Sequence, residues 1–236
     1  MNISSLYKNH NRETIWIIGS GPTLRLFDSN FFRDKITIGL NKAHYCFQYN
    51  LTYNITIHPE LIPRHFIPAQ MTWVTKRKDW LVNPSEEENK KVFWFKNNED
   101  VTDFSFVTSS DNHLYVGRGI HTAAMVLAAK MGASTIILVG CDFGKVEEQH
   151  HAIPQNVRFH GLPHKTVYRE YYKNACIVRA MIRKHFGTET YTLNPMLGNG
   201  QYCDEDFSTL LTEKNLPLLA DPKDDSRYKR SKPNFT

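Results

Sequence analysis

Short apolar runs alternate with longer stretches of helical spacing along the chain. Apolar residues recur every three to four positions over 119–131 and 165–186, which predicts two helices. Gly132 and Gly187 follow these segments, where a C-terminal cap is expected. Seven short apolar runs predict buried strands at 14–18, 35–40, 53–57, 71–75, 92–95, 135–139 and 190–193. This order predicts an α/β fold with a mostly parallel central sheet flanked by helices.

Residues 1–220 are expected to form a single Rossmann-like, nucleotide-binding transferase domain. Polar stretches at 83–91 and 97–113 predict loops within it, and 196–220 is expected to be irregular. Residues 221–236 form a basic tail that is expected to be flexible. The tail accounts for much of the chain's net charge of +5, so the folded body is expected to be close to neutral. This argues against a nucleic-acid-binding domain, although the tail leaves nucleic acid open as a partner.

Apolar runs are too short for a membrane span, which needs about twenty residues. The N-terminal stretch has no apolar segment of the kind found in secretory signals. The four cysteines are widely spaced and form no C-x-x-C pair, which is typical of reduced thiols. We therefore expect a cytoplasmic protein with no transmembrane segment, in which Cys141 belongs to the core.

Candidate chemistry follows the predicted strands, because ligands of open parallel sheets bind beyond the carboxyl ends of the strands. After the first strand, Gly19 and Gly21 allow a tight turn that approaches a phosphate or a ribose. N–H groups at the start of the next helix can then donate to the anion. A plain strand-to-helix turn would need the same glycines. The third glycine of the dinucleotide motif is missing and Asn41 ends the second strand, which argues against NAD.

Three further polar residues follow predicted strands. Asn41 can donate to and accept from a base, a ribose or a sugar in one contact. His58 follows the third strand and can face the cleft or serve structure alone. Asp142 could bind a metal diphosphate, hold a ribose hydroxyl or cap the next turn.

Histidines concentrate just before the second long helix. Four of the 11 histidines lie in this stretch: His150, His151, His160 and His164. A neutral imidazole here could take a proton from an acceptor hydroxyl, or these could be solvent-exposed loop histidines. Their spacing matches no familiar zinc pattern, so no metal site is expected.

Two signatures resemble those of the bacterial sialyltransferases of glycosyltransferase family 42. The first is Ile17–Leu24 followed by Gly39–Asn41, and the second is Gly119–Gly132 followed by Ile136–Phe143. The resemblance spans residues 14–195. The chain is also similar to a neighbouring branch of the superfamily, which contains hydroxymethylpterin diphosphokinases and motility-associated factors of flagellin modification.

The resemblance implies a variant GT-A-like domain and a metal-independent transferase. A sugar would pass from a nucleotide-activated donor, such as CMP-sialic acid, to a hydroxyl of a glycan or small molecule, with no cofactor required. His164 would be the general base, with His160 as its rival. The resemblance assigns nucleotide binding to Gly19, Ser20, Gly21, Pro22, Asn41, His58, Gly117, Arg118, Gly119 and Asp142.

The chain departs from the family after the Asp-Phe strand. Tyrosines that support the leaving phosphate are missing there, and the next tyrosine is Tyr168. Lys145, His150 or Arg158 could supply the charge instead.

Two alternatives stay open. One is a Mg²⁺-dependent diphosphokinase acting on a small alcohol, with Asp142 as the metal ligand. The other is a non-catalytic binding module of the same fold. Homo-oligomerisation is also left open.

Overall fold

A computed structural model describes residues 1–45, 51–59, 71–76, 90–98, 112–143 and 164–193. Seven strands form one sheet in which every neighbouring pair is parallel, in the order β5-β4-β3-β2-β1-β8-β9. They are β1 Thr14–Ile18, β2 Ile36–Leu40, β3 Tyr53–Thr56, β4 Thr72–Thr75, β5 Val92–Trp94, β8 Thr135–Val139 and β9 Glu189–Leu193. The α/β class and the parallel sheet are confirmed, and each predicted strand is placed within one residue of its ends.

The direction in which strands are added reverses at β1. From β1 the sheet grows one way through β2 to β5, and the other way through β8 and β9. Ile15 of β1 aligns with Ile36 of β2 on one side and with Ile136 of β8 on the other. The pairing of β1 with β8 is therefore the point at which the strand order reverses.

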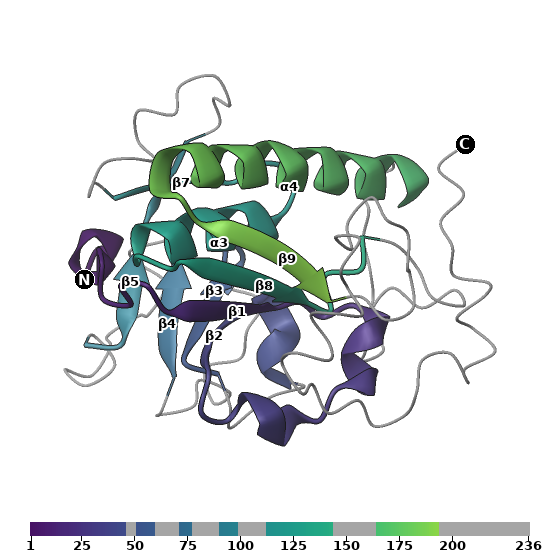
Figure 1. Ribbon diagram of the computed structural model, residues 1–236, viewed down its shortest axis with the longest axis horizontal. Helices are drawn as coiled ribbons and strands as arrows, with labels where there is room; N and C mark the ends of the chain where they lie inside the picture. Colours follow the sequence, from purple (N-terminus) through teal and green to yellow (C-terminus); the bar gives the residue numbers. More distant parts are fainter. Residues whose placement is uncertain (46–50, 60–70, 77–89, 99–111, 144–163, 194–236) are drawn as a thin grey trace.

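In the described residues, two α-helices cover one face of the sheet, and α3 lies next to the sheet while α4 lies on α3 (Figure 1). Helix α3 spans Ile120–Lys130 and α4 spans His164–Phe186. Gly132 and Gly187 follow them with positive φ angles of 94° and 66°, so the predicted glycine caps are confirmed. The opposite face carries the short 3-10 helices η2 Pro22–Leu26, η3 Ser29–Phe32 and η4 Asn41–Tyr45.

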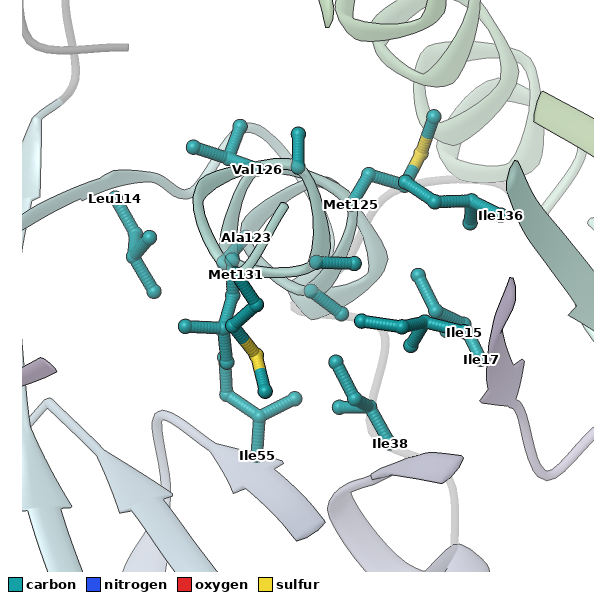
Figure 2. Packing of buried hydrophobic residues seen from close by; sticks show 14 of the residues in the cluster. Ile15, Ile17, Ile38, Ile55, Leu114, Ala123, Met125, Val126, Met131 and Ile136 are labelled. Atoms are coloured by element: carbon teal, nitrogen blue, oxygen red, sulfur yellow. The ribbon is translucent and has the colours of Figure 1, made fainter. Parts of the chain in front are cut away.

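Alternating side chains of each strand supply two apolar clusters, one on each face of the sheet. Ile15 and Ile17 of β1 belong to the cluster under α3, which Figure 2 shows around Ala123 and Met131. Trp16 and Ile18 point to the other cluster, together with the aromatic rings of η3 and its surroundings. Both faces of the central strands are covered, which explains their unbroken apolar runs.

Helix α3 is buried on every side, although its spacing predicted one apolar face. All eleven residues from Ile120 to Lys130 are buried, including the polar His121 and Thr122. The reason is that α4 and β7 (His113–Tyr115) enclose the side of α3 that faces away from the sheet. Small alanines let these layers approach closely.

The predicted loop at 97–113 was wrong at both of its ends. Lys96–Asn98 forms β6, which pairs in parallel with β7 in a separate two-stranded sheet. The polar sequence of β6 gives no apolar pattern from which a strand could be predicted. Backbone pairing with β7 and the hydrogen bond from Val116 N–H to Asn97 Oδ1 hold the strand in place. The N-terminus is also tied down, since Asn2 bridges to Trp94 just before η1 (Ile3–Leu6).

Several expectations lie outside the described residues. These are most of the loop at 83–91, the irregular segment 196–220 and the tail 221–236. Within the described part of the chain, no helix has the length and apolar character that crossing a membrane requires.

The close packing of α3 predicts that it will not accept larger side chains. Ala124 is fully buried, whereas Ala180 on the outer side of α4 is exposed. Ala124→Leu should lower the free energy of unfolding by about 1–3 kcal/mol. Ala180→Leu, the same change on the surface, should alter it by less than about 0.5 kcal/mol. Urea denaturation measures both, and equal effects would contradict this packing.

Candidate functional site

Four predicted site segments lie at one edge of the sheet. Gly19–Pro22, Asn41, His58 and Asp142 follow β1, β2, β3 and β8, which are neighbours in the order β3-β2-β1-β8. Because all four strands are parallel, their carboxyl ends meet at the same edge. The structure thus brings these segments together at the reversal of strand order.

The N–H groups of the glycine turn already have acceptors within the protein. Gly19 N–H donates to Val139 O at 2.7 Å, and Gly21 N–H donates to Gly140 O at 2.8 Å. Thr23 N–H donates to Asp142 Oδ2 at 2.8 Å. Amides at the start of the next helix were expected to donate to a ligand anion, and Thr23 N–H, which lies there, donates to Asp142 instead. Together these bonds tie the end of β1 to the end of β8. Pro22 has no N–H at all.

The two glycines of the turn have a packing reason. A Cβ on Gly19 would overlap the carbonyl of Gly140, and a Cβ on Gly21 would lie 2.5 Å from Asp142 Oδ2. Either residue with a side chain would push the ends of β1 and β8 apart. The structural explanation of the glycines is therefore supported, and nucleotide contact by residues 19–22 stays a prediction.

Asp142 caps the turn that follows β1. Its two carboxyl oxygens accept from the N–H and the hydroxyl of Thr23, and the side chain is buried. Burial raises the pKa of Asp142 to about 6, while the bonds from Thr23 oppose that rise. Capping a turn was one of the three roles open to Asp142. The turn that it caps is at Thr23, more than a hundred residues earlier in the sequence.

Asn41 is held in a left-handed conformation, with φ of 50°. Its carbonyl accepts from Asn54 Nδ2 and from His44 Nδ1, both at 2.9 Å, and its Oδ1 accepts from the Thr56 hydroxyl at 3.1 Å. Asparagine tolerates this conformation better than most residues. No described residue accepts a hydrogen bond from Asn41 Nδ2, so the donor that was expected to face a ligand remains available.

His58 is linked to Asn41 through one residue. Its N–H donates to Thr56 Oγ1 at 3.1 Å, and the same hydroxyl donates to Asn41. The His58 side chain is exposed at this edge. His58 and Asn41 therefore lie just beyond the ends of the adjacent strands β3 and β2, as the strand-end argument predicted.

The loop before α3 is fastened to the first turn of that helix. Gly117 N–H donates to Thr122 Oγ1 at 3.0 Å, and this hydroxyl donates to Gly119 O at 2.8 Å. Gly119 is the N-cap of α3 and offers no side-chain cap to the turn that follows. Thr122 N–H also donates to Gly119 O at 3.3 Å. The N–H groups of Ile120 and His121 precede the first bonds within the helix.

Arg118 is exposed between the two glycines and close to α4. Its positive charge acts on the hydroxyl of Tyr171: burial raises the pKa of Tyr171 and the guanidinium partly offsets this. Burial, Tyr171 and the charge of Asp142 together raise the pKa of Tyr168. The rings of Tyr168 and Tyr171 lie 6.2 Å apart, so α4 brings two tyrosines to the carboxyl edge.

His121 is a site residue that the sequence did not single out. It lies on the first turn of α3 and is only 5% exposed. Its Nε2 lies 3.1 Å from Tyr171 O, and its ring packs against Phe143 with centroids 4.9 Å apart. Burial lowers its pKa to about 4. The only signal in the sequence was a polar residue inside an otherwise small and apolar helix.

The histidines favoured as general bases are only partly placed. His164 is the first residue of α4, so the helix begins one residue before the predicted start at 165. His150, His151 and His160 lie outside the described residues, as do Lys145 and Arg158. In the described ranges, no group of three or more His, Cys, Asp or Glu side chains could hold a metal ion.

Positive charge is more concentrated than the sequence argument assumed. Helix α4 contains six lysines and arginines against Glu170, a formal charge of +5 that equals the charge of the whole chain. Arg183 is paired with Glu189 at 2.9 Å. The folded body is thus close to neutral only because the negative charge of its other residues offsets the positive charge of α4.

Comparison with known proteins adds no relative. A scan against family models, a search of curated proteins and a search of solved structures each found no match.

The burial of Asp142 predicts a pH dependence, because it raises the pKa of the carboxyl more than the bonds from Thr23 lower it. The folded state holds the Asp142 proton more tightly than an unfolded chain, whose pKa is near 3.8. The folded state therefore binds more protons between about pH 4 and 6, so this group's contribution to stability is lost as the pH rises through that window. Asp142→Asn cannot ionise and keeps an acceptor for Thr23 N–H.

Urea denaturation at several pH values measures this contribution. The difference in stability between wild type and Asp142→Asn should change between pH 4 and 6, with the wild type losing relative stability as the pH rises. Asp142→Ala should cost about 1–3 kcal/mol at pH 7, because Thr23 loses a buried acceptor. Parallel pH curves for wild type and Asp142→Asn would contradict the assignment.

Proposed function

We propose that this chain transfers a sugar from a nucleotide-activated donor, such as CMP-sialic acid, to a hydroxyl acceptor without a metal ion. The observation that carries the proposal is the arrangement at the reversal of strand order. There, the first turn of α3 reaches the end of β8, where His121 packs against Phe143, and exposed Arg118 comes just before that turn. Such an edge is where nucleotides bind in Rossmann-like sheets, and the strand order supports this fold, in a variant GT-A-like form.

The first turn of α3 suits the phosphate better than the glycine turn does. Its N–H groups lie at the N-terminus of an eleven-residue helix, which is the positive end of the helix dipole. The guanidinium of Arg118, just before this turn, adds a full positive charge. In the glycine turn, the N–H groups of Gly19 and Gly21 already donate to the carbonyls of Val139 and Gly140. On this proposal Gly117–Gly119 holds the phosphate, while Asn41 and His58 face the rest of the nucleotide.

The reaction requires one bond to form as another breaks. The acceptor oxygen attacks the anomeric carbon, the bond from that carbon to the phosphate oxygen breaks, and the acceptor proton passes to His164. His160 is the second candidate for this base. The departing phosphate gains negative charge, which Arg118 and the helix amides would stabilise.

Two tyrosines on α4 are candidates to replace the tyrosines that the family has after the strand equivalent to β8. Tyr168 lies within the electrostatic reach of Asp142, and Tyr171 within that of Arg118. The ordinary tyrosine pKa of 10 already keeps both hydroxyls protonated at neutral pH and burial raises it further, so both can donate a hydrogen bond. They could support the leaving phosphate from a different element of the chain.

Asp142 favours metal-independent transfer over the diphosphokinase alternative. Its oxygens accept from Thr23 and its side chain is buried, so a role as Mg²⁺ ligand would require it to leave Thr23. The described residues offer it no cluster of further ligands.

Ligand binding is the first test. We expect one of CMP, UDP, GDP and ATP to raise the melting temperature equally with and without Mg²⁺. A ligand at a hundred times its Kd stabilises by about 2.7 kcal/mol, which is readily measured. Arg118→Gln should weaken this stabilisation, whereas Lys184→Gln, an exposed lysine at the far end of α4, should not. Stabilisation only with Mg²⁺ would favour the diphosphokinase.

Turnover is the second test. We expect slow hydrolysis of CMP-sialic acid that persists in EDTA and is lost in His164→Ala. Hydrolysis that survives both treatments would overturn the His164 mechanism. Activity on ATP and a small alcohol that vanishes in EDTA and in Asp142→Asn would support diphosphoryl transfer instead.

A further inference from the structure

We propose that His121 Nδ1 accepts a hydrogen bond from a sugar-ring hydroxyl of the nucleotide ligand whose phosphate lies on Arg118 and the first turn of α3. The inference rests on the proposed function and adds a residue that neither the sequence motifs nor the resemblance assigned. It makes His121 a binding residue that selects hydroxylated ligands.

One contact fixes the protonation of the ring. His121 Nε2 lies 3.1 Å from the backbone carbonyl of Tyr171, and a carbonyl oxygen can only accept. Nε2 therefore carries the proton. Burial lowers the pKa of the imidazole to about 4, so at neutral pH the ring is uncharged and Nδ1 presents a lone pair.

No described residue donates a hydrogen bond to Nδ1, although His121 as a whole is only 5% exposed. Nδ1 is not one of the fully buried side-chain atoms that lack a partner, so its lone pair is open to a molecule from outside the protein. The ring cannot easily turn away, because Phe143 and Tyr171 pack against it with centroids 4.9 Å and 5.8 Å distant.

Nδ1 is directed at the loop that the proposal gives to the phosphate. A Cβ on Gly119 would lie only 2.5 Å from Nδ1, so this nitrogen lies directly against the backbone of the N-cap and only glycine fits there. The same N-cap provides no acceptor for the first-turn amides of α3. Donors for an anion and an acceptor for a hydroxyl thus lie next to one another, as a sugar phosphate requires.

Two uncharged substitutions separate the two nitrogens. His121→Gln can still donate to Tyr171 O from near the Nε2 position, but it removes the acceptor at Nδ1. His121→Asn places an amide near the Nδ1 position and loses the bond to Tyr171 O. If Nδ1 binds the ligand, His121→Gln should weaken binding about tenfold and His121→Asn should weaken it less. Denaturation of both variants shows whether each is folded.

The probes are CMP, UDP, GDP and ATP, followed by the sugar nucleotide of whichever binds, all measured by calorimetry on the full chain. Equal weakening of the nucleotide and its sugar nucleotide in His121→Gln would assign the hydroxyl to the ribose. Weakening of the sugar nucleotide alone would assign it to the transferred sugar. Both outcomes support the inference.

A structural role for His121 predicts a different pattern. In that case His121→Asn would lose more stability than His121→Gln, and neither would change affinity once folded, which would overturn the inference. The nitrogen NMR signal of Nδ1 gives an independent readout, because it should move toward the position of a hydrogen-bonded nitrogen when the nucleotide is added to wild type. If no nucleotide binds wild type, the proposed function itself fails.

Discussion

The ends of β1 and β8 are held within hydrogen-bond distance of one another, and the carboxyl edge of the sheet depends on this contact. Gly21 N–H donates to Gly140 O, and Thr23 donates to both oxygens of Asp142. Neither glycine of the turn could carry a side chain without parting the strands. In most open sheets the reversal of strand order leaves a crevice at this point. Here hydrogen bonds within the chain link the segments that follow the two strands at that point.

The proposed function therefore places the anion of the ligand at the start of α3 and not at the glycine turn. The N–H groups of Gly19 and Gly21 already donate within the protein, whereas those of Ile120 and His121 precede the first bonds within α3 and follow Arg118 directly. Positive φ angles at Asn41, Gly140 and Phe143 show that the backbone is constrained at several strand ends of this edge. Constrained backbone of this kind is common at functional sites, which agrees with a binding role.

The sequence predicted the fold well because strands that are buried on both faces have unbroken apolar runs. Runs such as Ile15–Ile18 and Ile136–Val139 leave little choice of structure, and the glycine after α3 marks its end. The sequence could not predict β6, because its residues are polar and backbone pairing holds them in place. Nor could the sequence predict that α4 would cover the outer side of α3. The site was located by strand ends alone. Contacts between distant segments, such as those of Asp142 with Thr23 and of His121 with Tyr171, have no local pattern.

A ¹H–¹⁵N correlation spectrum of the full chain tests the central claim, which is that the ligand's anion lies on the start of α3. CMP, UDP, GDP and ATP would be added in turn to labelled protein. The account predicts that the nucleotide that binds will shift the backbone amide signals of Gly119, Ile120 and His121 most. Amides of Gly19 and Gly21, which already donate within the protein, should shift less. Largest shifts at Gly19 and Gly21, or away from this edge of the sheet, would contradict it.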